Sequence, residues 1–283
     1  MRIPRGWALV LLGVPIAFLI AFFVVPFLVV VLSSLHTKDG AWTVMNYVKA
    51  FSDFYYWDTL FLTFKLSLMI TVCSLLVGYP LAYYMIYGLN SRLLRRIFYI
   101  VVVTPLFTSN IVRSFGWMVL LGRRGMINDA LTSIGLVERP LSLLFSETSI
   151  VIGLTYIMTP FMVLTVSGVL QNIDRSLEEA SQDLGAGALV TFLKITLPLS
   201  MPGVIAGSLI VFTLSVSAYV TPSILSGGKE IVMSMLIFQQ YGSVFDFNFG
   251  ATLAVTLLVT TIVLVAGYLL AMERGTRMRA AAA

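Results

Sequence analysis

Long apolar runs separated by polar connections dominate the pattern of this 283-residue chain. One bilayer crossing needs about 20 mostly apolar residues, and six runs reach that length. The two longest polar connections, 33–60 and 122–147, have room for short surface helices. The pattern therefore predicts an all-α polytopic membrane protein that forms a single transmembrane domain over 1–283. The six expected spans are 7–32, 61–87, 97–121, 148–170, 199–226 and 247–272.

Composition supports a membrane protein and excludes several other classes. Hydrophobic residues make up 59% of the chain and charged residues 11%, against about 25% charged in an average soluble domain. The net charge of +5 does not indicate a nucleic-acid partner, because the basic residues stand in short groups beside apolar runs. The single cysteine and the single histidine offer neither a disulfide nor a metal-ligand cluster.

Lysine and arginine in the short connections predict the orientation, since they gather on the cytoplasmic side. Ten basic residues fall on one predicted face, which also carries both termini and the 171–198 connection: Arg2, Arg5, Arg92, Arg95, Arg96, Arg175, Lys194, Arg274, Arg277 and Arg279. The opposite face collects six: Lys38, Lys49, Arg123, Arg124, Arg139 and Lys229. Both termini are therefore expected in the cytoplasm.

The 171–198 connection, here called the elbow, is charged and amphipathic. Its first apolar positions recur at helical spacing: Ile173, Leu177, Ala180 and Leu184. Ser176 and Glu179 have the spacing of a capping box, and Gly185 suits the left-handed position just past a helix end. A second short helix through Leu189–Ile195 should stop before Pro198, and Pro202 is expected in the first turn of the fifth span. The elbow is thus predicted to be a stiff helix-turn-helix.

Seven elbow positions fit the pattern E-A-A-x3-G-x9-I-x-L-P, with serine in the third place. They are Glu179, Ala180, Ser181, Gly185, Ile195, Leu197 and Pro198. This pattern resembles the loop by which membrane subunits of binding-protein-dependent ABC importers contact their ATPases. The resemblance implies the type I importer fold of six spans. It also implies that the elbow docks in a cleft of the ATPase, where Glu179 meets a basic residue.

Segments outside the elbow resemble the spermidine/putrescine permeases of the PotB type, among them 51–87, 104–113, 153–162 and 219–228. The resemblance implies a bacterial inner-membrane permease that works with a second permease subunit, two ATPase subunits and a periplasmic solute-binding protein. A small polar solute would be carried, polyamine first, with an opine, an amino acid such as a GABA-like one, or a phosphonate as alternatives. Whether the second permease is a homologue or a copy stays open.

No catalytic constellation is visible in the sequence, so the chain is expected not to be an enzyme. Leu225–Lys229 resembles the signature sequence of ABC ATPases, yet the chain contains no G-x4-G-K-[ST] phosphate loop. ATP and Mg²⁺ would therefore be bound by the partner ATPase, and this chain is expected to hold no cofactor and no metal.

The expected spans contain no acidic residue, so aromatic rings, hydroxyl groups or the partner subunit would have to hold a cationic solute. Six residues are candidates for the solute pathway: Phe212, Ser215, Tyr219, Thr221, Tyr156 and Arg113. On a continuous fifth span, Phe212, Ser215 and Tyr219 would share a face, although helix packing explains such residues equally well. A secondary transporter is a more distant alternative. It would need intramembrane acids or an inverted repeat.

Overall fold

The computed structural model describes residues 5–89 and 91–281, and all the named elements in this part of the chain are helical. Among the described residues, five helices are long and apolar enough to cross a membrane, and a sharply bent pair supplies a sixth crossing if it is counted as one span. The predicted all-helical membrane class is confirmed. The chain divides into two compact units. The first comprises Met1–Asp58 and Met233–Ala283, and the second comprises Thr59–Val232.

The first unit joins the two ends of the chain. Its elements are α1 (Arg5–Leu19), η1 (Ile20–Val24), α2 (Val25–Ser34), α3 (Met45–Ser52), α13 (Met233–Gln239), η5 (Gln240–Val244) and α14 (Phe247–Ala281), together with the start of α4 (Phe54–Tyr83). The α2 end packs on α14, where Thr252 Oγ1 donates to the Ser34 carbonyl at 3.1 Å and Asn248 Nδ2 donates to the His36 carbonyl at 2.6 Å.

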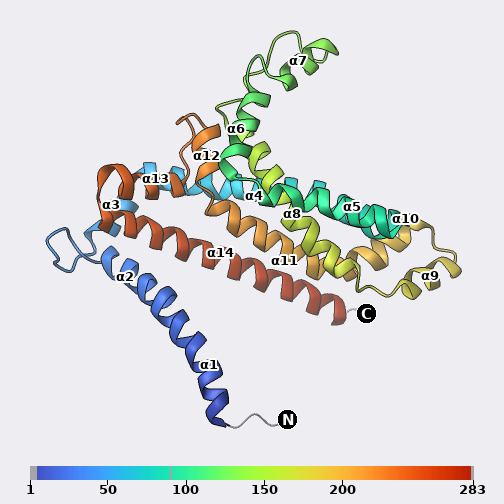
Figure 1. Ribbon diagram of the computed structural model, residues 1–283, viewed down its shortest axis with the longest axis horizontal. Coiled ribbons are helices and arrows are strands. Elements are labelled where there is room, and N and C mark those ends of the chain that lie inside the picture. The colour runs from blue at the N-terminus through green and yellow to red at the C-terminus, as the bar shows by residue number, and fades with distance from the viewer. Residues whose placement is uncertain (1–4, 90, 282–283) are drawn as a thin grey trace. The chain divides into compact units, whose positions relative to one another are not determined.

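The described part of the second unit contains the rest of α4 and eleven further elements. In chain order these are η2 (Tyr84–Gly88), α5 (Arg92–Val103), η3 (Thr104–Phe107), α6 (Asn110–Leu121), α7 (Met126–Ser133), α8 (Glu147–Leu170), α9 (Arg175–Asp183), α10 (Ala188–Thr191), η4 (Phe192–Thr196), α11 (Leu197–Val216) and α12 (Val220–Leu225). Helices α8 and α11 lie side by side and form its main helix pair (Figure 1).

Glycine allows α8 and α11 to approach closely. A Cβ added at Gly203 would lie 2.9 Å from Val169 Cγ2, and one added at Gly207 would lie 2.7 Å from Met162 Sδ. Small residues spaced four apart are typical of tight helix contacts in membranes, where packing rather than the hydrophobic effect holds helices together. The Gly203-x-x-x-Gly207 edge of α11 therefore determines the position of this helix against α8.

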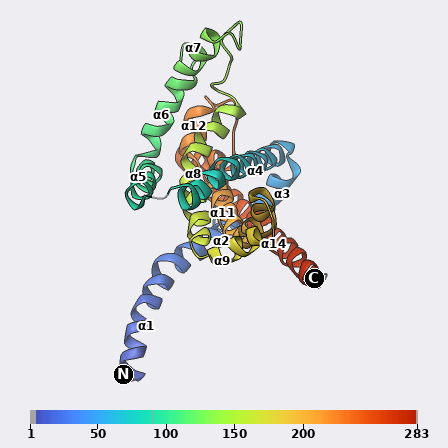
Figure 2. The same ribbon diagram turned by 90° about the vertical axis from the view of Figure 1, so that its right-hand side faces the viewer.

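The third predicted span, 97–121, is not one straight helix. The segments Arg92–Phe107 and Asn110–Ser133 meet at an angle of 99°, and Figure 2 shows α5 and α6 on either side of this bend. Pro105 cannot donate a backbone hydrogen bond to the preceding turn, and Thr108 is extended. Ser109 then caps a new helix by accepting from the Ile111 amide at 3.3 Å.

The fifth predicted span, 199–226, is wrong at both ends. Its helix begins at Ala188, because α10, η4 and α11 form one continuous helix to Val216. The helix therefore does not stop before Pro198, and Pro202 lies well inside it. At the other end, the chain leaves helical structure after Val216 and α12 starts at Val220, which places Pro222 in a first turn where no amide partner is required.

Two further sequence expectations need qualification. Helices α4 and α8 begin earlier than the predicted spans, so Glu147 is the first residue of α8, where it forms an ion pair with Lys65 at 2.6 Å. Of the residues used to predict orientation, Arg2 lies outside the described residues. The side chains of Arg5, Arg274, Arg277 and Arg279 lie outside them too.

Candidate functional site

The elbow is a helix-turn-helix with both ends of its first helix capped. Asp174 is the N-cap of α9, accepting from the Ser176 amide at 3.0 Å, so the predicted capping box at Ser176 and Glu179 is wrong. This hydrogen bond lowers the pKa of the exposed Asp174 carboxyl below its ordinary value. The capping position lies two residues earlier than predicted because the Asp174 carboxylate satisfies the free amide of Ser176.

Gly185 ends α9 as predicted. Its φ is +86°, and its amide donates to the Gln182 carbonyl at 2.8 Å while the Ala186 amide donates to Ser181 at 3.1 Å. These two bonds are the Schellman motif, which requires a left-handed residue at this position. Glycine adopts that conformation without a steric penalty, so Gly185 fixes the direction in which the chain leaves α9.

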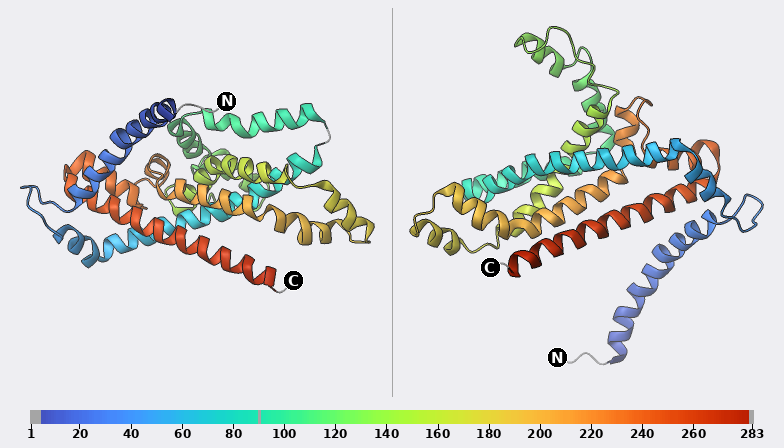
Figure 3. Two further views of the ribbon diagram at one scale, coloured as in Figure 1. Left: turned by 90° about the horizontal axis from the view of Figure 1, so that it is seen from below. Right: turned by 180° about the vertical axis from the view of Figure 1, so that it is seen from behind.

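Side chains hold the two arms of the elbow together. Thr196 Oγ1 donates to Glu178 Oε1 at 2.5 Å, and the hydroxyls of Ser181 and Thr191 lie 3.1 Å apart. Thr191 and Thr196 are buried. Because the second arm continues into α11 without a break, these contacts attach α9 to the membrane helix itself. Figure 3 shows α9 and α10 at the far end of α11 from α12.

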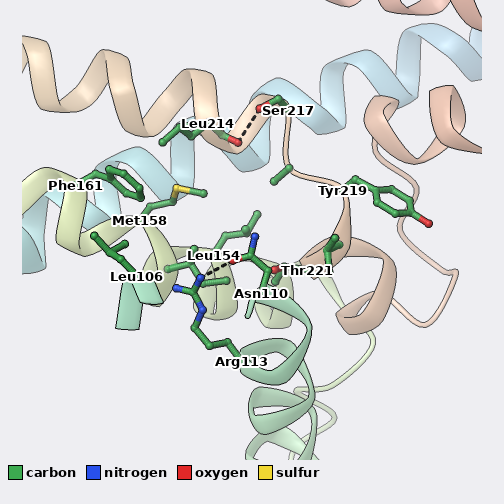
Figure 4. A pocket seen from close by; sticks show the side chains of 13 residues that line it. Leu106, Asn110, Arg113, Leu154, Met158, Phe161, Leu214, Ser217, Tyr219 and Thr221 are labelled. Carbon is green, nitrogen blue, oxygen red and sulfur yellow. Dashed lines mark hydrogen bonds between the residues drawn. The ribbon is translucent and has the colours of Figure 1, made fainter. Parts of the chain in front are cut away.

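A second feature, a cavity of about 530 Å³, lies at the other end of α11 (Figure 4). It opens where two helices break, between η3 and α6 and between α11 and α12. Its walls are mostly apolar, with Leu106, Leu154, Met158, Phe161 and Leu214 among them. Its polar lining consists of Asn110, Arg113, Ser217, Tyr219 and Thr221.

Arg113 gives the cavity wall a positive charge. Its Nη2 donates to Asn110 Oδ1 at 2.5 Å, while Nε and Nη1 are buried without a hydrogen-bond partner in the described chain. None of the described residues that line the cavity is acidic. Buried donors on a charged group carry a desolvation cost unless an acceptor reaches them. The cavity is therefore suited to an acceptor group supplied from outside this chain.

Helix α12 packs against both α6 and α8 beside the cavity. Ser114 Oγ donates to Thr221 Oγ1 at 2.9 Å, and Ser149 Oγ donates to the Leu225 carbonyl at 2.9 Å. A Cβ at Gly153 would lie 2.4 Å from Leu225 Cδ1, so α8 and α12 are in close contact. These links hold α12 to α6 and α8 across the break that separates it from α11.

Residues 74–272 match the family model described as "Binding-protein-dependent transport system inner membrane component". The chain belongs to this family. The matched range includes the elbow. It also includes every residue that lines the cavity beside Arg113, here called the Arg113 cavity, since these residues fall between Leu106 and Thr221. The chain is thus a helical inner-membrane component of a transport system, as the elbow pattern predicts.

Named relatives are similar over most of the chain. The spermidine/putrescine transport system permease protein PotB of Escherichia coli (strain K12) is 29% identical over 250 residues, covering 86% of this chain and 90% of PotB. The protein of the same name from Haemophilus influenzae is 31% identical over 261 residues, covering 89% of each.

Solved structures match in fold. A bacterial ABC transporter involved in import of the acidic polysaccharide alginate aligns with a TM-score of 0.73 at 19% identity, covering 95% of this chain and 96% of that one. The alginate transporter in complex with an alginate pentasaccharide-bound periplasmic protein aligns with a TM-score of 0.69 at 19% identity, covering 93% and 92%. At 19% identity, both matches show that the chain shares the fold of these proteins.

The seven elbow positions divide into two groups. Glu179, Ala180, Gly185 and Pro198 are exposed, whereas Ser181, Ile195 and Leu197 are half-buried. Sequence reasoning missed Glu178, whose contact with Thr196 depends on a neighbour 18 positions away. The E-E pair at 178–179 is therefore split, with one carboxylate bonded inside the elbow and the other directed to its surface.

The six predicted pathway residues do not lie together. Arg113, Tyr219 and Thr221 line the cavity, although Figure 4 shows the Tyr219 ring directed away from the Arg113 guanidinium. Ser215 is buried and Phe212 stacks on Phe64 with ring centroids 6.2 Å apart. The predicted common face fails because the helix ends at Val216.

Tyr156 lines a separate, mostly apolar cavity of about 490 Å³ and packs edge-on against Trp117, with ring centroids 5.6 Å apart. Sequence reasoning missed Asn110 as a cavity residue. The signal was present in Pro105 and Ser109, since a proline followed closely by an N-cap residue marks a helix break.

Proposed function

We propose that this chain is one permease subunit of an ATP-driven importer in the bacterial inner membrane, and that the elbow is its joint with the ATPase. It pairs with a homologous permease subunit, two ATPase subunits that hold ATP and Mg²⁺, and a periplasmic solute-binding protein. The elbow and both termini lie in the cytoplasm. Membership of the transport family and the fold of the alginate importers support this assignment.

The observation that carries the coupling role is the apolar surface of the elbow. Leu184 is 89% exposed and Leu177 47%, although α9 lies outside the helices that are long and apolar enough to cross a membrane. The apolar stripe predicted from sequence thus faces outward instead of covering the protein's own core. Exposed apolar surface of this kind, rimmed by polar groups such as Glu179, marks protein contacts. An ATPase cleft would cover it.

The rigidity of the elbow suits a mechanical role. Its second arm and α11 form one helix of 29 residues, Ala188–Val216, and the hydrogen bonds of Glu178 and Ser181 attach α9 to that arm. Movement of α9 by an ATPase therefore reaches the membrane helix directly. The ATPase performs the chemistry, and this chain converts the movement into opening and closing of a solute path.

The solute we propose is a polyamine, which the names of the PotB relatives support. The Arg113 cavity is electrostatically negative at one end and positive at the other. The C-terminal end of α11 at Leu214–Ser217 carries the negative end of a helix dipole, which attracts an ammonium group. Arg113 on the opposite wall repels one. An opine, an amino acid or a phosphonate is the alternative class, because its anionic group would pair with Arg113.

Uptake into proteoliposomes tests the assignment. Vesicles that contain the complete complex should accumulate labelled spermidine or putrescine when ATP and the solute-binding protein are supplied. Accumulation of an amino acid or opine instead, with no polyamine uptake, would replace the solute. Uptake at an undiminished rate without the ATPase would indicate a secondary transporter and refute the importer assignment.

A matched pair of variants tests the elbow. Glu179 and Asp183 are both exposed acidic residues of α9, so replacing either removes the same charge. Glu179→Ala should lower ATP-driven uptake because its carboxylate is proposed to meet a basic residue of the ATPase, whereas Asp183→Ala should leave uptake close to wild type. Equal effects of the two changes would remove Glu179 from the proposed joint.

A further inference from the structure

The inner end of α4 lacks a cation of its own. The helix continues through the wide turn η2 to Gly88, and its last turn contains no basic residue. The final carbonyl groups of any helix have no partner within it, and together they carry the negative end of the helix dipole. This helix, 35 residues long with η2 included, therefore needs partners for these carbonyls from elsewhere in the chain.

Two arginines from separate elements supply them. Arg95 Nη2 on α5 and Arg175 Nη2 on α9 both donate to the Ile86 carbonyl, at 3.1 and 3.2 Å, and Arg95 Nη2 also reaches the Leu89 carbonyl at 3.1 Å. The Arg175 guanidinium lies over the Tyr87 ring, 5.5 Å from its centroid. We name this cluster of Ile86, Tyr87, Leu89, Arg95 and Arg175 the arginine clamp.

The clamp attaches the elbow to a second membrane helix. Through Glu178 and Thr196, α9 is bonded to the arm that continues into α11. Through Arg175 it is bonded to the end of α4 and, by the shared Ile86 carbonyl, to Arg95 of α5. The α9 helix is thus held at points 175 and 178, one turn apart, by two different membrane helices.

Arginine is suited to this position. Its planar guanidinium presents several donors in a fixed fork and stacks on aromatic rings, so one side chain can bind a carbonyl and rest on Tyr87 together. A lysine would keep the charge but has a single flexible ammonium group. Arg95 and Arg175 belong to the basic residues that predict the membrane orientation, and this explains their charge. It does not explain why both side chains bind the same carbonyl oxygen.

We propose that Arg95 and Arg175 are positioning residues that transmit movement of α9 to α4 and α5, so that the elbow drives three membrane helices instead of α11 alone. The inference rests on the proposed role of the elbow as the joint with an ATPase. Loss of the clamp should leave α9 able to dock and to support ATP hydrolysis. The movement would then reach α11 without carrying α4 along, and ATP would be hydrolysed without matching transport.

The test compares two double variants in the complete complex in proteoliposomes. The variant Arg95→Ala/Arg175→Ala removes the clamp. The control Arg92→Ala/Arg96→Ala removes the same charge from exposed arginines of α5, which separates the clamp from the effect of basic residues on topology. Solute uptake and ATP hydrolysis are measured on the same vesicles, and their ratio is the readout.

For the clamp variant we expect solute carried per ATP to fall at least about five-fold, the low end of typical coupling between sites, with ATP hydrolysis retained. The control should keep the wild-type ratio. Arg175→Lys should retain more of the wild-type ratio of solute carried per ATP than Arg175→Gln, because lysine keeps the positive charge opposite the helix end. A simple loss of folding would lower assembly and both activities together and would not follow this order.

Three results would overturn the inference while leaving the proposed function intact: a wild-type ratio in the clamp variant, an equal fall in the control, or a parallel loss of uptake and hydrolysis in an assembled complex. If the clamp variant does not assemble, the same ratio measured on Arg175→Gln decides, with a fall supporting the clamp and a wild-type value refuting it. Absence of ATP-driven uptake by the wild-type complex would instead refute the proposed function.

Discussion

Replacing Gly185 by alanine should weaken the elbow through backbone conformation alone. Its φ of +86° lies in the left-handed region, and a Cβ there would find no atom within 4 Å, so no steric clash contributes. The left-handed conformation costs an ordinary residue ~1–2 kcal/mol. Alanine also stiffens the unfolded chain, which offsets ~0.4–1 kcal/mol of that cost. The net loss should be on the order of 1 kcal/mol.

Gly187 provides a matched control two residues away. It too has no atom within 4 Å of an added Cβ, but its φ is −69°, which alanine adopts freely. Because the unfolded-chain contribution is the same for both changes, the difference between Gly185→Ala and Gly187→Ala gives the ~1–2 kcal/mol conformational cost, reduced by the smaller cost of alanine at Gly187, which is the N-cap of α10. Gly185→Asn should fall between them, since asparagine tolerates left-handed backbone.

The difference can be measured in two ways. Amide hydrogen exchange over 174–190 in the purified complex should be faster in Gly185→Ala than in Gly187→Ala, because the Schellman bonds of Gly185 and Ala186 are weakened. ATP-driven uptake per ATP should fall in the same order. Identical hydrogen-exchange rates and identical uptake in the two variants would refute the prediction, because they would show that the left-handed conformation of Gly185 does not stabilise the elbow.

Three further predictions address packing, capping and the cavity. Gly203→Ala should lower the thermal unfolding midpoint, since its Cβ would meet Val169 Cγ2 at 2.9 Å and overpacking costs ~1–3 kcal/mol, while Gly168→Ala on α8, with nothing within 4 Å, should not. Folding lowers the pKa of the Asp174 carboxyl, so its cap should stabilise α9 fully at pH values above the ordinary aspartate pKa of 3.8 and lose that effect as the pH falls through the folded-state pKa. Hydrogen exchange of α9 should show this loss in wild type and not in Asp174→Asn. Thr221→Val removes the Ser114–Thr221 bond and should cost ~1 kcal/mol in thermal stability, and an unchanged midpoint would mean that this bond does not hold α12 to α6.

Local signals in the sequence were sufficient for some features and not for others. The left-handed turn at Gly185 and the helical spacing before it depend on residues close together in the chain, and both predictions are confirmed. The cap was assigned to Ser176 instead of Asp174, because both residue types cap helices and spacing alone cannot choose between them. Proline produced the larger errors. Pro198 was expected to end a helix, but the wide turn of η4 precedes it and the helix continues.

Contacts between distant residues were beyond reach of the sequence. Glu178 and Thr196, Ser114 and Thr221, and the two arginines at Ile86 meet only after the helices pack. The length of the apolar runs identified the spans, but an apolar run does not reveal a bend within it, so the 99° break near Pro105 and the end of α11 at Val216 were missed. Both breaks border the Arg113 cavity, which is why only three of the six predicted pathway residues, Arg113, Tyr219 and Thr221, line it.

The positions of these breaks explain how one chain could link the elbow to a solute cavity. The helix Ala188–Val216 is 29 residues long, or roughly 44 Å at 1.5 Å per residue, and it runs from the second arm of the elbow to the cavity wall. Beyond Val216, α12 is held to α6 through Thr221 and to α8 through Leu225. The three non-helical residues Ser217–Tyr219 are therefore where a moving α11 meets a fixed α12. Under the proposed function, displacement of the elbow changes the cavity at this junction, since Ser217 and Tyr219 both line it.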